Sequence, residues 1–210
     1  MPSGYDRIAR HYDALARVIF GKSIMRAQKF GLSEIPPGSH VLIVGGGTGK
    51  VLEYLSACKI SVLHIDYVEA SEAMIDIARH RKADGLHIHF ICQPIVEYSR
   101  QKAYDVIITQ FFLDCFEGVA LKNVFSTLSN QLKVNGTWII ADFQVSKDWK
   151  KIWQKSLLSM MYLFFSVTVG LQAKKLDDFQ YLIKQLGYRL KTSQSYYASF
   201  IFSSTYQKSA

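Results

Sequence analysis

The first 35 residues carry apolar positions at helical spacing. Ser3 and Asp6 have the spacing of a capping box, in which each side chain satisfies a free backbone N–H at the start of a helix. A second helical stretch follows from Ser23 and ends before the breaker Pro36-Pro37-Gly38. The apolar face of the first stretch is formed by Tyr5, Ile8, Ala9, Tyr12, Leu15, Ala16 and Ile19.

Beyond the prolines, short apolar runs alternate with helical stretches, and Asn135-Gly136 predicts a turn into the fifth run. Strand–helix alternation with short connections predicts a parallel sheet covered on both faces, which binds ligands at the carboxyl ends of its strands. Strands are expected at 40–44, 61–68, 88–92, 105–109 and 137–141, and helices at 51–58, 71–81 and 119–132.

The last third of the chain has a different pattern. Residues 149–173 form an apolar helical insert, and 176–186 a further helix with Gly187 as its cap. Strand-like runs at 188–194 and 198–207 predict an antiparallel hairpin. We therefore expect a single α/β domain over residues 1–210, with a Rossmann-like, mostly parallel seven-stranded sheet, helices on both faces and a closing hairpin.

Composition adds limits to this picture. Hydrophobic residues make up 49% of the 210, which is enough for one sizeable core. The net charge is +8, but the basic residues are spread along the chain, so the sequence favours solubility over a nucleic-acid footprint. Cys58, Cys92 and Cys115 are far apart and odd in number, which supports neither disulfides nor a metal site. With no signal peptide at the polar N-terminus, we expect a cytoplasmic protein.

A glycine-rich loop, VLIVGGGTGK, follows the first buried strand and opens a helix. Such a loop lets the backbone approach a ligand closely, and the helix start offers free N–H groups. Its spacing is G-x-G-x-G, from Gly45, Gly47 and Gly49. Lys50 breaks the dinucleotide pattern G-x-G-x-x-G, and Val51 breaks the P-loop pattern, which needs Ser or Thr there.

Glu69 lies twenty positions after Gly49, at the end of the second predicted strand. A carboxylate in this place can accept hydrogen bonds from both ribose hydroxyls of a nucleoside. Asp66 is a competing acid but lies inside the strand pattern. The alternative role for Glu69 is to cap the helix that follows.

These segments resemble the class I S-adenosylmethionine (SAM)-dependent methyltransferases, most closely the ubiquinone/menaquinone C-methyltransferases and related small-molecule enzymes. The resemblance runs from Tyr5 to Phe143 and includes YDRIARHYD, the glycine loop, VEASEAMIDIAR, YDVIITQFFLDCF and LSNQLKVNGTWIIADF. It implies SAM as cofactor, a SAM-binding core over 38–145 and a lid over 1–35. The implied cofactor contacts are Gly45, Gly46, Gly47 and Gly49 at the methionine and ribose, Glu69 at the ribose, Ala70, Met74, Gln93, Pro94 and Ile95 at the adenine, Thr109 and Gln110 at the methionine, and Tyr5 and Tyr12 in the lid.

Two positions depart from the family pattern. The family usually has an acid two residues before the first glycine, where this chain has Ile43. It often has an aspartate after the third strand, where Pro94 aligns beside Gln93. These changes leave open a degenerate protein that kept the fold and binds the cofactor weakly or not at all.

The candidate bases for an oxygen or nitrogen acceptor are Asp114, Asp142 and His11. The simpler reading of Asp114 is a helix cap or a solvated side chain, and that of His11 is a surface residue. The apolar insert is too short, and too interrupted by polar residues, for a transmembrane helix. It is interpreted either as part of the core or as a lid over an apolar acceptor.

We thus expect a methyltransferase acting on a small apolar or amphiphilic acceptor such as a quinone, phenol or lipid. Metal, nucleic acid and a transmembrane span are not expected, and peripheral membrane contact is compatible with the sequence. Three alternatives remain. The first is a non-catalytic scaffold. The second is a nucleic-acid methyltransferase, but such enzymes carry an N/D-P-P-Y/F run after the fourth strand, where this chain has TQFF. The third is an NAD(P) oxidoreductase, which the glycine spacing disfavours.

Overall fold

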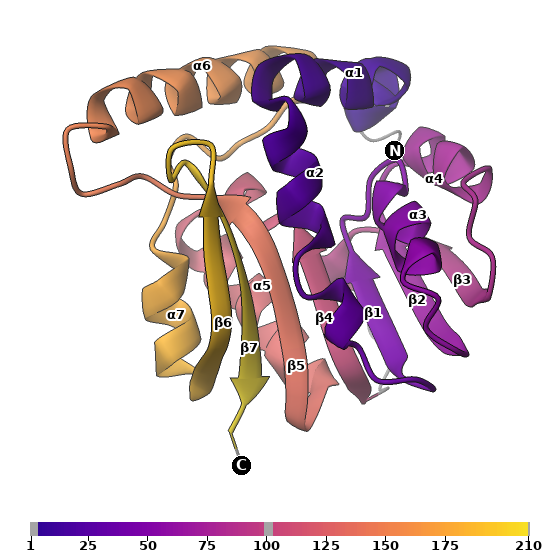
Figure 1. The fold of residues 1–210 in the computed structure, drawn as a ribbon. Coiled ribbons are helices and arrows are strands. Elements are labelled where there is room, and N and C mark those ends of the chain that lie inside the picture. Colours follow the sequence, from indigo (N-terminus) through magenta and orange to yellow (C-terminus); the bar gives the residue numbers. More distant parts are fainter. Residues whose placement is uncertain (1–3, 99–102, 210) are drawn as a thin grey trace.

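The computed structural model describes residues 4–98 and 103–209. Seven strands form one sheet in the order β3-β2-β1-β4-β5-β7-β6 (Figure 1). The strands from β1 to β5 pair in parallel, whereas β7 runs antiparallel to both β5 and β6. The predicted fold class is confirmed. The strands are β1 His40–Val44, β2 Leu63–Glu69, β3 Leu86–Cys92, β4 Tyr104–Gln110, β5 Leu132–Phe143, β6 Tyr188–Tyr196 and β7 Ile201–Lys208.

Helices cover both faces of the sheet, and two of them lie across its upper edge (Figure 1). One face packs against α5 and α7, and the other against α3 and the end of α4. Helices α1 and α6 lie at the top, where the carboxyl ends of the parallel strands meet. The helices are α1 Ala9–Phe20, α2 Lys22–Lys29, α3 Lys50–Ala57, α4 Glu72–Arg79, α5 Gly118–Gln131, α6 Lys151–Val169 and α7 Phe179–Gln185, with short 3-10 turns η1 Gly4–Arg7, η2 Leu32–Glu34, η3 Ile95–Glu97 and η4 Leu113–Cys115.

The N-terminal segment differs from the prediction. The chain forms the η1 turn before α1 begins at Ala9, and Ser3 lies outside the described residues. Asp6 does not cap its own helix. Its carboxylate accepts hydrogen bonds from Ser71 Oγ (2.5 Å) and Ala73 N (3.2 Å), at the start of α4. A free N–H and the capping hydroxyl of a different helix thus bind this side chain, which is a long-range contact that local spacing does not reveal.

Two further boundaries were predicted wrongly. Asn135 and Gly136 do not precede the fifth strand but lie inside β5, where the pairing shifts from Tyr104 with Leu132 to Val106 with Thr137. The chain therefore enters the sheet early and bulges at Asn135, whose φ is 63°.

The predicted helical insert, 149–173, is helical only over α6, which ends at a left-handed Gly170. Among the described residues, no helix is long and apolar enough to cross a membrane.

Candidate functional site

The glycine loop between β1 and α3 is crowded at its ends and open in the middle. A Cβ added to Gly45 would lie 2.1 Å from the ring of Phe112, and one added to Gly49 would lie 2.7 Å from Ala78. A Cβ at Gly47 would meet nothing within 4 Å, although its φ is 59°. The outer glycines therefore allow close packing of the protein itself, while Gly47 leaves free space beside the backbone that a ligand can use.

Glu69 ends β2 and lies directly beside this loop. Its two carboxylate oxygens accept hydrogen bonds from Gly47 N (2.9 Å) and Ser71 N (3.0 Å). Burial raises the pKa of Glu69, whereas the backbone N–H groups act in the opposite direction. The cap of α4 is Ser71, whose Oγ accepts from Met74 N (3.1 Å), so Glu69 is not the helix cap. Each oxygen of Glu69 keeps a second lone pair for another donor.

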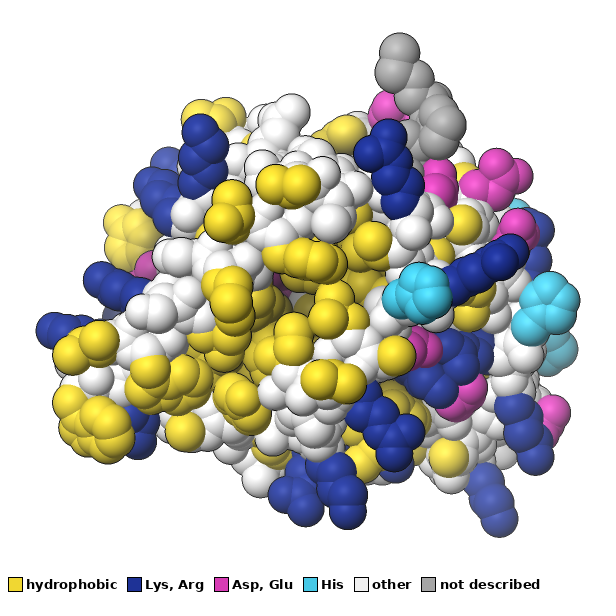
Figure 2. Space-filling view, turned by 90° about the horizontal axis from the view of Figure 1, so that it is seen from above, with side chains coloured by type: hydrophobic (Ala, Val, Ile, Leu, Met, Phe, Trp, Pro, Cys, Tyr) yellow, Lys and Arg dark blue, Asp and Glu magenta, His cyan; other side chains and the backbone are white. Residues whose placement is uncertain are grey.

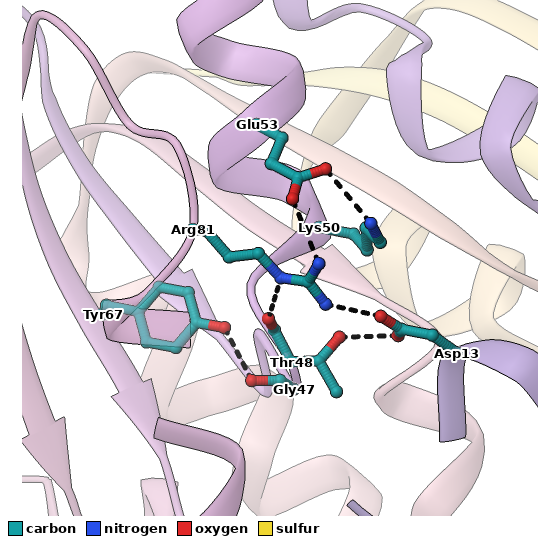
Figure 3. A network of polar contacts seen from close by, with 7 residues as sticks. All are labelled: Asp13, Gly47, Thr48, Lys50, Glu53, Tyr67 and Arg81. Atoms are coloured by element: carbon teal, nitrogen blue, oxygen red, sulfur yellow. Dashed lines mark hydrogen bonds and ion pairs between the residues drawn. The ribbon is translucent and has the colours of Figure 1, made fainter. Parts of the chain in front are cut away.

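Tyr67, also on β2, holds the same loop from the other side. Its hydroxyl donates to the carbonyl of Gly47 (2.9 Å; Figure 3). Its ring fills the space that a side chain at position 46 would need. Both backbone groups of Gly47 are therefore bound by β2. The loop is preorganised before any ligand arrives, which lowers the entropic cost of binding.

A charge network ties the N-terminal helix α1 to the loop (Figure 3). Asp13 accepts from Thr48 Oγ1 (2.6 Å) and forms an ion pair with Arg81 (2.5 Å). Arg81 also donates to the Thr48 carbonyl (2.8 Å) and pairs with Glu53 (3.0 Å), which in turn binds Lys50 (3.1 Å). The network brings together α1, the glycine loop, α3 and the end of α4. Sequence reasoning missed Asp13 and Arg81, although Asp13 lies in the quoted YDRIARHYD segment.

The predicted adenine contacts lie at the ends of β2 and β3, and they differ in exposure. Ala70 and Pro94 are exposed, and Gln93 is half-buried with its N–H on the Glu69 carbonyl (3.0 Å). Ile95 and Met74 are buried, at 4% and 2% exposure. The first three therefore offer surface to a ligand at this edge, whereas the last two support it from the core.

The side chains at the end of β4 form hydrogen bonds with other parts of the chain. Thr109 is fully buried, and its hydroxyl accepts from the indole N–H of Trp138 (3.0 Å). Gln110 donates through Nε2 to the carbonyl of Gln28 (2.7 Å). Its buried Oε1 finds no hydrogen-bond donor in the described part of the chain. A buried acceptor without a donor is costly, so this atom is a place where a bound ligand would supply one.

An apolar cavity of about 240 Å³ lies between α1, α6 and the ends of β4 and β5. Tyr5 and Tyr12 line it, and Tyr5 OH lies 3.4 Å from Cys115 Sγ. Both tyrosines contact Phe165 of α6, with ring centroids 6.3 and 6.4 Å apart. Burial raises the pKa of both tyrosines, so they remain neutral. The N-terminal segment and α6 together form the roof of this cavity.

Two buried carboxyl groups meet at the inner end of the cavity. Asp114 lines it, whereas Asp142 is fully buried and accepts from the backbone N–H groups of Leu113 (3.0 Å), Asp114 (3.3 Å) and Phe143 (2.8 Å). Burial raises the pKa of both groups, and repulsion by Asp114 adds to the effect at Asp142. Asp142 thus fixes the backbone that carries Asp114, and Asp114 is the carboxyl group that reaches the cavity.

The other sequence candidates are placed less centrally. His11 is exposed on α1 and is not among the cavity-lining residues, so the structure does not bring it to Asp114. Ile43 is buried among the residues under α3, at 1% exposure. Cys115 lines the cavity and was missed, because a lone half-buried cysteine has no sequence pattern of its own.

Comparison with known proteins agrees with this geometry. Residues 41–136 match the methyltransferase domain family, and no protein with a curated description matches the sequence. A chain of the Haloferax volcanii complex that contains the Trm112 methyltransferase activator has a TM-score of 0.73 at 12% identity, and the match covers 100% of both chains.

Two solved methyltransferases with bound S-adenosylhomocysteine share the fold. The N-methyltransferase NodS from Bradyrhizobium japonicum has a TM-score of 0.64 at 13% identity, over 89% of this chain and 86% of that chain. The Burkholderia thailandensis 1,6-didemethyltoxoflavin-N1-methyltransferase, which also holds 1,6-didemethyltoxoflavin, has a TM-score of 0.60 at 13% identity, over 96% and 88%. The part of the chain that matches the methyltransferase domain model, residues 41–136, contains the glycine loop, Glu69 and β4.

Proposed function

We propose that this protein is a SAM-dependent methyltransferase whose acceptor is a small apolar or amphiphilic molecule bound in the cavity beneath α1 and α6. The observation that carries the proposal is the position of this cavity. It lies at the carboxyl ends of β4 and β5, and its walls are almost entirely apolar. Strand β4 pairs with β1, at whose end the glycine loop begins. Ligand sites of parallel sheets lie at this edge, and apolar walls with few polar groups are typical of small-molecule sites.

The residues present fit SAM. The free space at Gly47 admits a ligand beside the loop, and Glu69 keeps lone pairs for the two ribose hydroxyls. The buried Oε1 of Gln110, which has no donor in the described residues, can accept from the ammonium group of the methionine moiety. We assign Gln93 and Pro94 to the edge of the adenine ring. The cofactor would supply a methyl group already activated by its positive sulfur.

Asp114 is the group that we expect to act on the acceptor. It faces the cavity, and burial raises its pKa to about 6, which makes its carboxylate a stronger base than an exposed aspartate. A hydroxyl or amine of the acceptor would donate its proton to Asp114 as the methyl bond forms. Tyr5, Tyr12 and Phe165 exclude water from this space and orient the acceptor.

Calorimetric titration with SAM and with S-adenosylhomocysteine tests the proposal. We expect micromolar binding to the wild type and a loss of at least about tenfold in Glu69→Gln, because the neutral amide is a weaker acceptor for ribose hydroxyls. Glu97→Gln, at an exposed position on η3, is the matched control and should bind like the wild type. If the wild type binds neither ligand, the scaffold interpretation replaces this proposal.

A further inference from the structure

Helix α6 is apolar on two opposite faces. One face packs on the domain through residues that are at most 7% exposed, namely Gln154, Leu158, Met161 and Tyr162. The other face points to solvent and lies within a sector of roughly 80° on a helical projection. It carries Ile152, Met160, Leu163 and Val167, which are 60–75% exposed. A surface helix normally turns polar residues outward. This stripe instead exposes apolar side chains to water, which is unfavourable in free energy.

The stripe borders the cavity at Met160. Met160 and Phe164 line the cavity and are themselves 60% and 39% exposed, so the apolar walls continue onto the outer surface. Figure 2 looks onto this face and shows hydrophobic side chains around a hollow. Trp149, which precedes α6, and Val18 on α1 are also exposed, at 73% and 83%.

Basic side chains flank the start of α6. Lys147, Lys151 and Lys155 are exposed, and none of them pairs with an acid in residues 4–98 and 103–209. In Figure 2, Lys and Arg side chains lie around the apolar area. These three lysines place positive charge at the start of α6, which attracts an extended negative surface.

We propose that this face docks onto an anionic lipid bilayer. The docking face is defined by Trp149, Ile152, Met160, Leu163 and Val167, and its basic residues are the exposed Lys147, Lys151 and Lys155 at the N-terminal end of α6. An apolar stripe with an aromatic residue and lysines is the arrangement by which a helix lies in the membrane interface, with its lysines reaching the anionic head groups. Docking brings the cavity entrance against the lipid. Resting on the proposed function, this implies that the acceptor is a lipid-dissolved molecule that enters directly from the bilayer.

Vesicle sedimentation tests the docking. We expect the protein to bind vesicles of phosphatidylglycerol and phosphatidylcholine much more strongly than phosphatidylcholine alone. Leu163→Gln/Val167→Gln should weaken binding by about tenfold through lost apolar burial. Replacing Lys147, Lys151 and Lys155 by Gln should weaken it by about 100-fold at low salt.

Matched controls lie away from this face. Val134→Gln/Leu190→Gln removes two apolar side chains with 55% and 52% exposure near the opposite end of the sheet. Gln at the exposed Lys59, Lys184 and Lys191 removes the same charge as the triple lysine variant. Both controls should bind vesicles nearly as well as the wild type. Circular dichroism of all four variants checks that each is folded.

Tryptophan fluorescence supplies a second measurement on the unmodified protein. Trp138 is fully buried and Trp153 half-buried, so a blue shift on adding anionic vesicles reports mainly on Trp149. Unchanged vesicle binding in Leu163→Gln/Val167→Gln would overturn the proposal, as would absent binding by the wild type. So would a dimer of the wild type that this variant abolishes, since the face would then join two copies. Titration with S-adenosylhomocysteine is independent of docking, and therefore separates failure here from failure of the proposed function.

Discussion

At the scale of single residues, Asp114 makes the protein sensitive to pH. Burial raises its pKa from 3.8 to about 6, so the folded state holds this proton more tightly than the unfolded chain does. Its contribution to stability is complete below pH 4 and is lost as the pH rises through 6. In Asp114→Asn the side chain cannot ionise, so the folded state does not lose this stability as the pH rises. We therefore expect the variant to gain up to about 3 kcal/mol over the wild type between pH 4 and 7.5, measured by urea unfolding.

Asp84→Asn is the control for this comparison, because Asp84 is exposed and its ion pair with Lys82, at 3.6 Å, lies at the surface. Its stability should follow that of the wild type at every pH. Parallel curves for Asp114→Asn and wild type would show that Asp114 titrates normally. With an acceptor in hand, the same variant should lose about 100-fold in rate while S-adenosylhomocysteine binds as before.

At the scale of elements, the N-terminal segment is fixed at two points. Asp6 binds the start of α4, and Asp13 binds both Thr48 and Arg81. Asp13→Asn keeps a polar side chain but removes the charge that Arg81 pairs with. Since both partners are partly exposed, we expect a loss of about 1 kcal/mol, which raises the opening of α1 about fivefold. Hydrogen exchange of the α1 amides measures this change.

Asp76→Asn supplies the comparison for the lid, since it also removes a carboxylate that pairs with an arginine. Asp76 and Arg79 are more than half exposed and lie on one turn of α4, at 3.4 Å. Exchange in α1 should be unaffected by this change. Equal exchange in α1 for both variants would mean that the Asp13 contacts do not hold the lid.

The elements that the sequence predicts well are those with a local cause. The run HVLIV forms β1 over the expected residues, because a strand covered on both faces needs continuous apolar residues. The left-handed Gly187 likewise lies where the predicted helix 176–186 was expected to end. The glycine spacing and Glu69 also fall side by side, because parallel strands end at the same edge of the sheet.

Contacts between distant segments could not be predicted from the sequence. Asp6 has the spacing for capping its own helix, yet it binds α4, 65 positions away. Arg81 reads as one of many scattered basic residues, and only the folded chain brings it to Asp13. The apolar insert predicted a core or a lid. That α6 has a second, exposed apolar face depends on how the helix is rotated over the sheet, which residue pattern alone does not fix.

At the scale of the whole molecule, polar and apolar functions occupy adjoining parts of one edge. The glycine loop and its carboxylates lie over β1 and β2, while the apolar cavity lies over β4 and β5 under α1 and α6. Helix α1 contributes to both, through Asp13 and Tyr12. A cofactor bound at the loop would therefore also stabilise the lid, and binding should be visible in the stability of the entire domain.

Thermal unfolding with S-adenosylhomocysteine measures that coupling. A ligand that binds only the folded state at 100 times its Kd adds about 2.7 kcal/mol. For a domain of this size that is a rise in Tm of roughly 5–10 °C. NADH at the same concentration should leave Tm unchanged, because Lys50 interrupts the dinucleotide spacing of the loop. Stabilisation by NADH alone would instead assign the loop to a dinucleotide. The ligand should raise the Tm of Asp13→Asn by less than that of the wild type, because part of its binding free energy then offsets the cost of ordering α1.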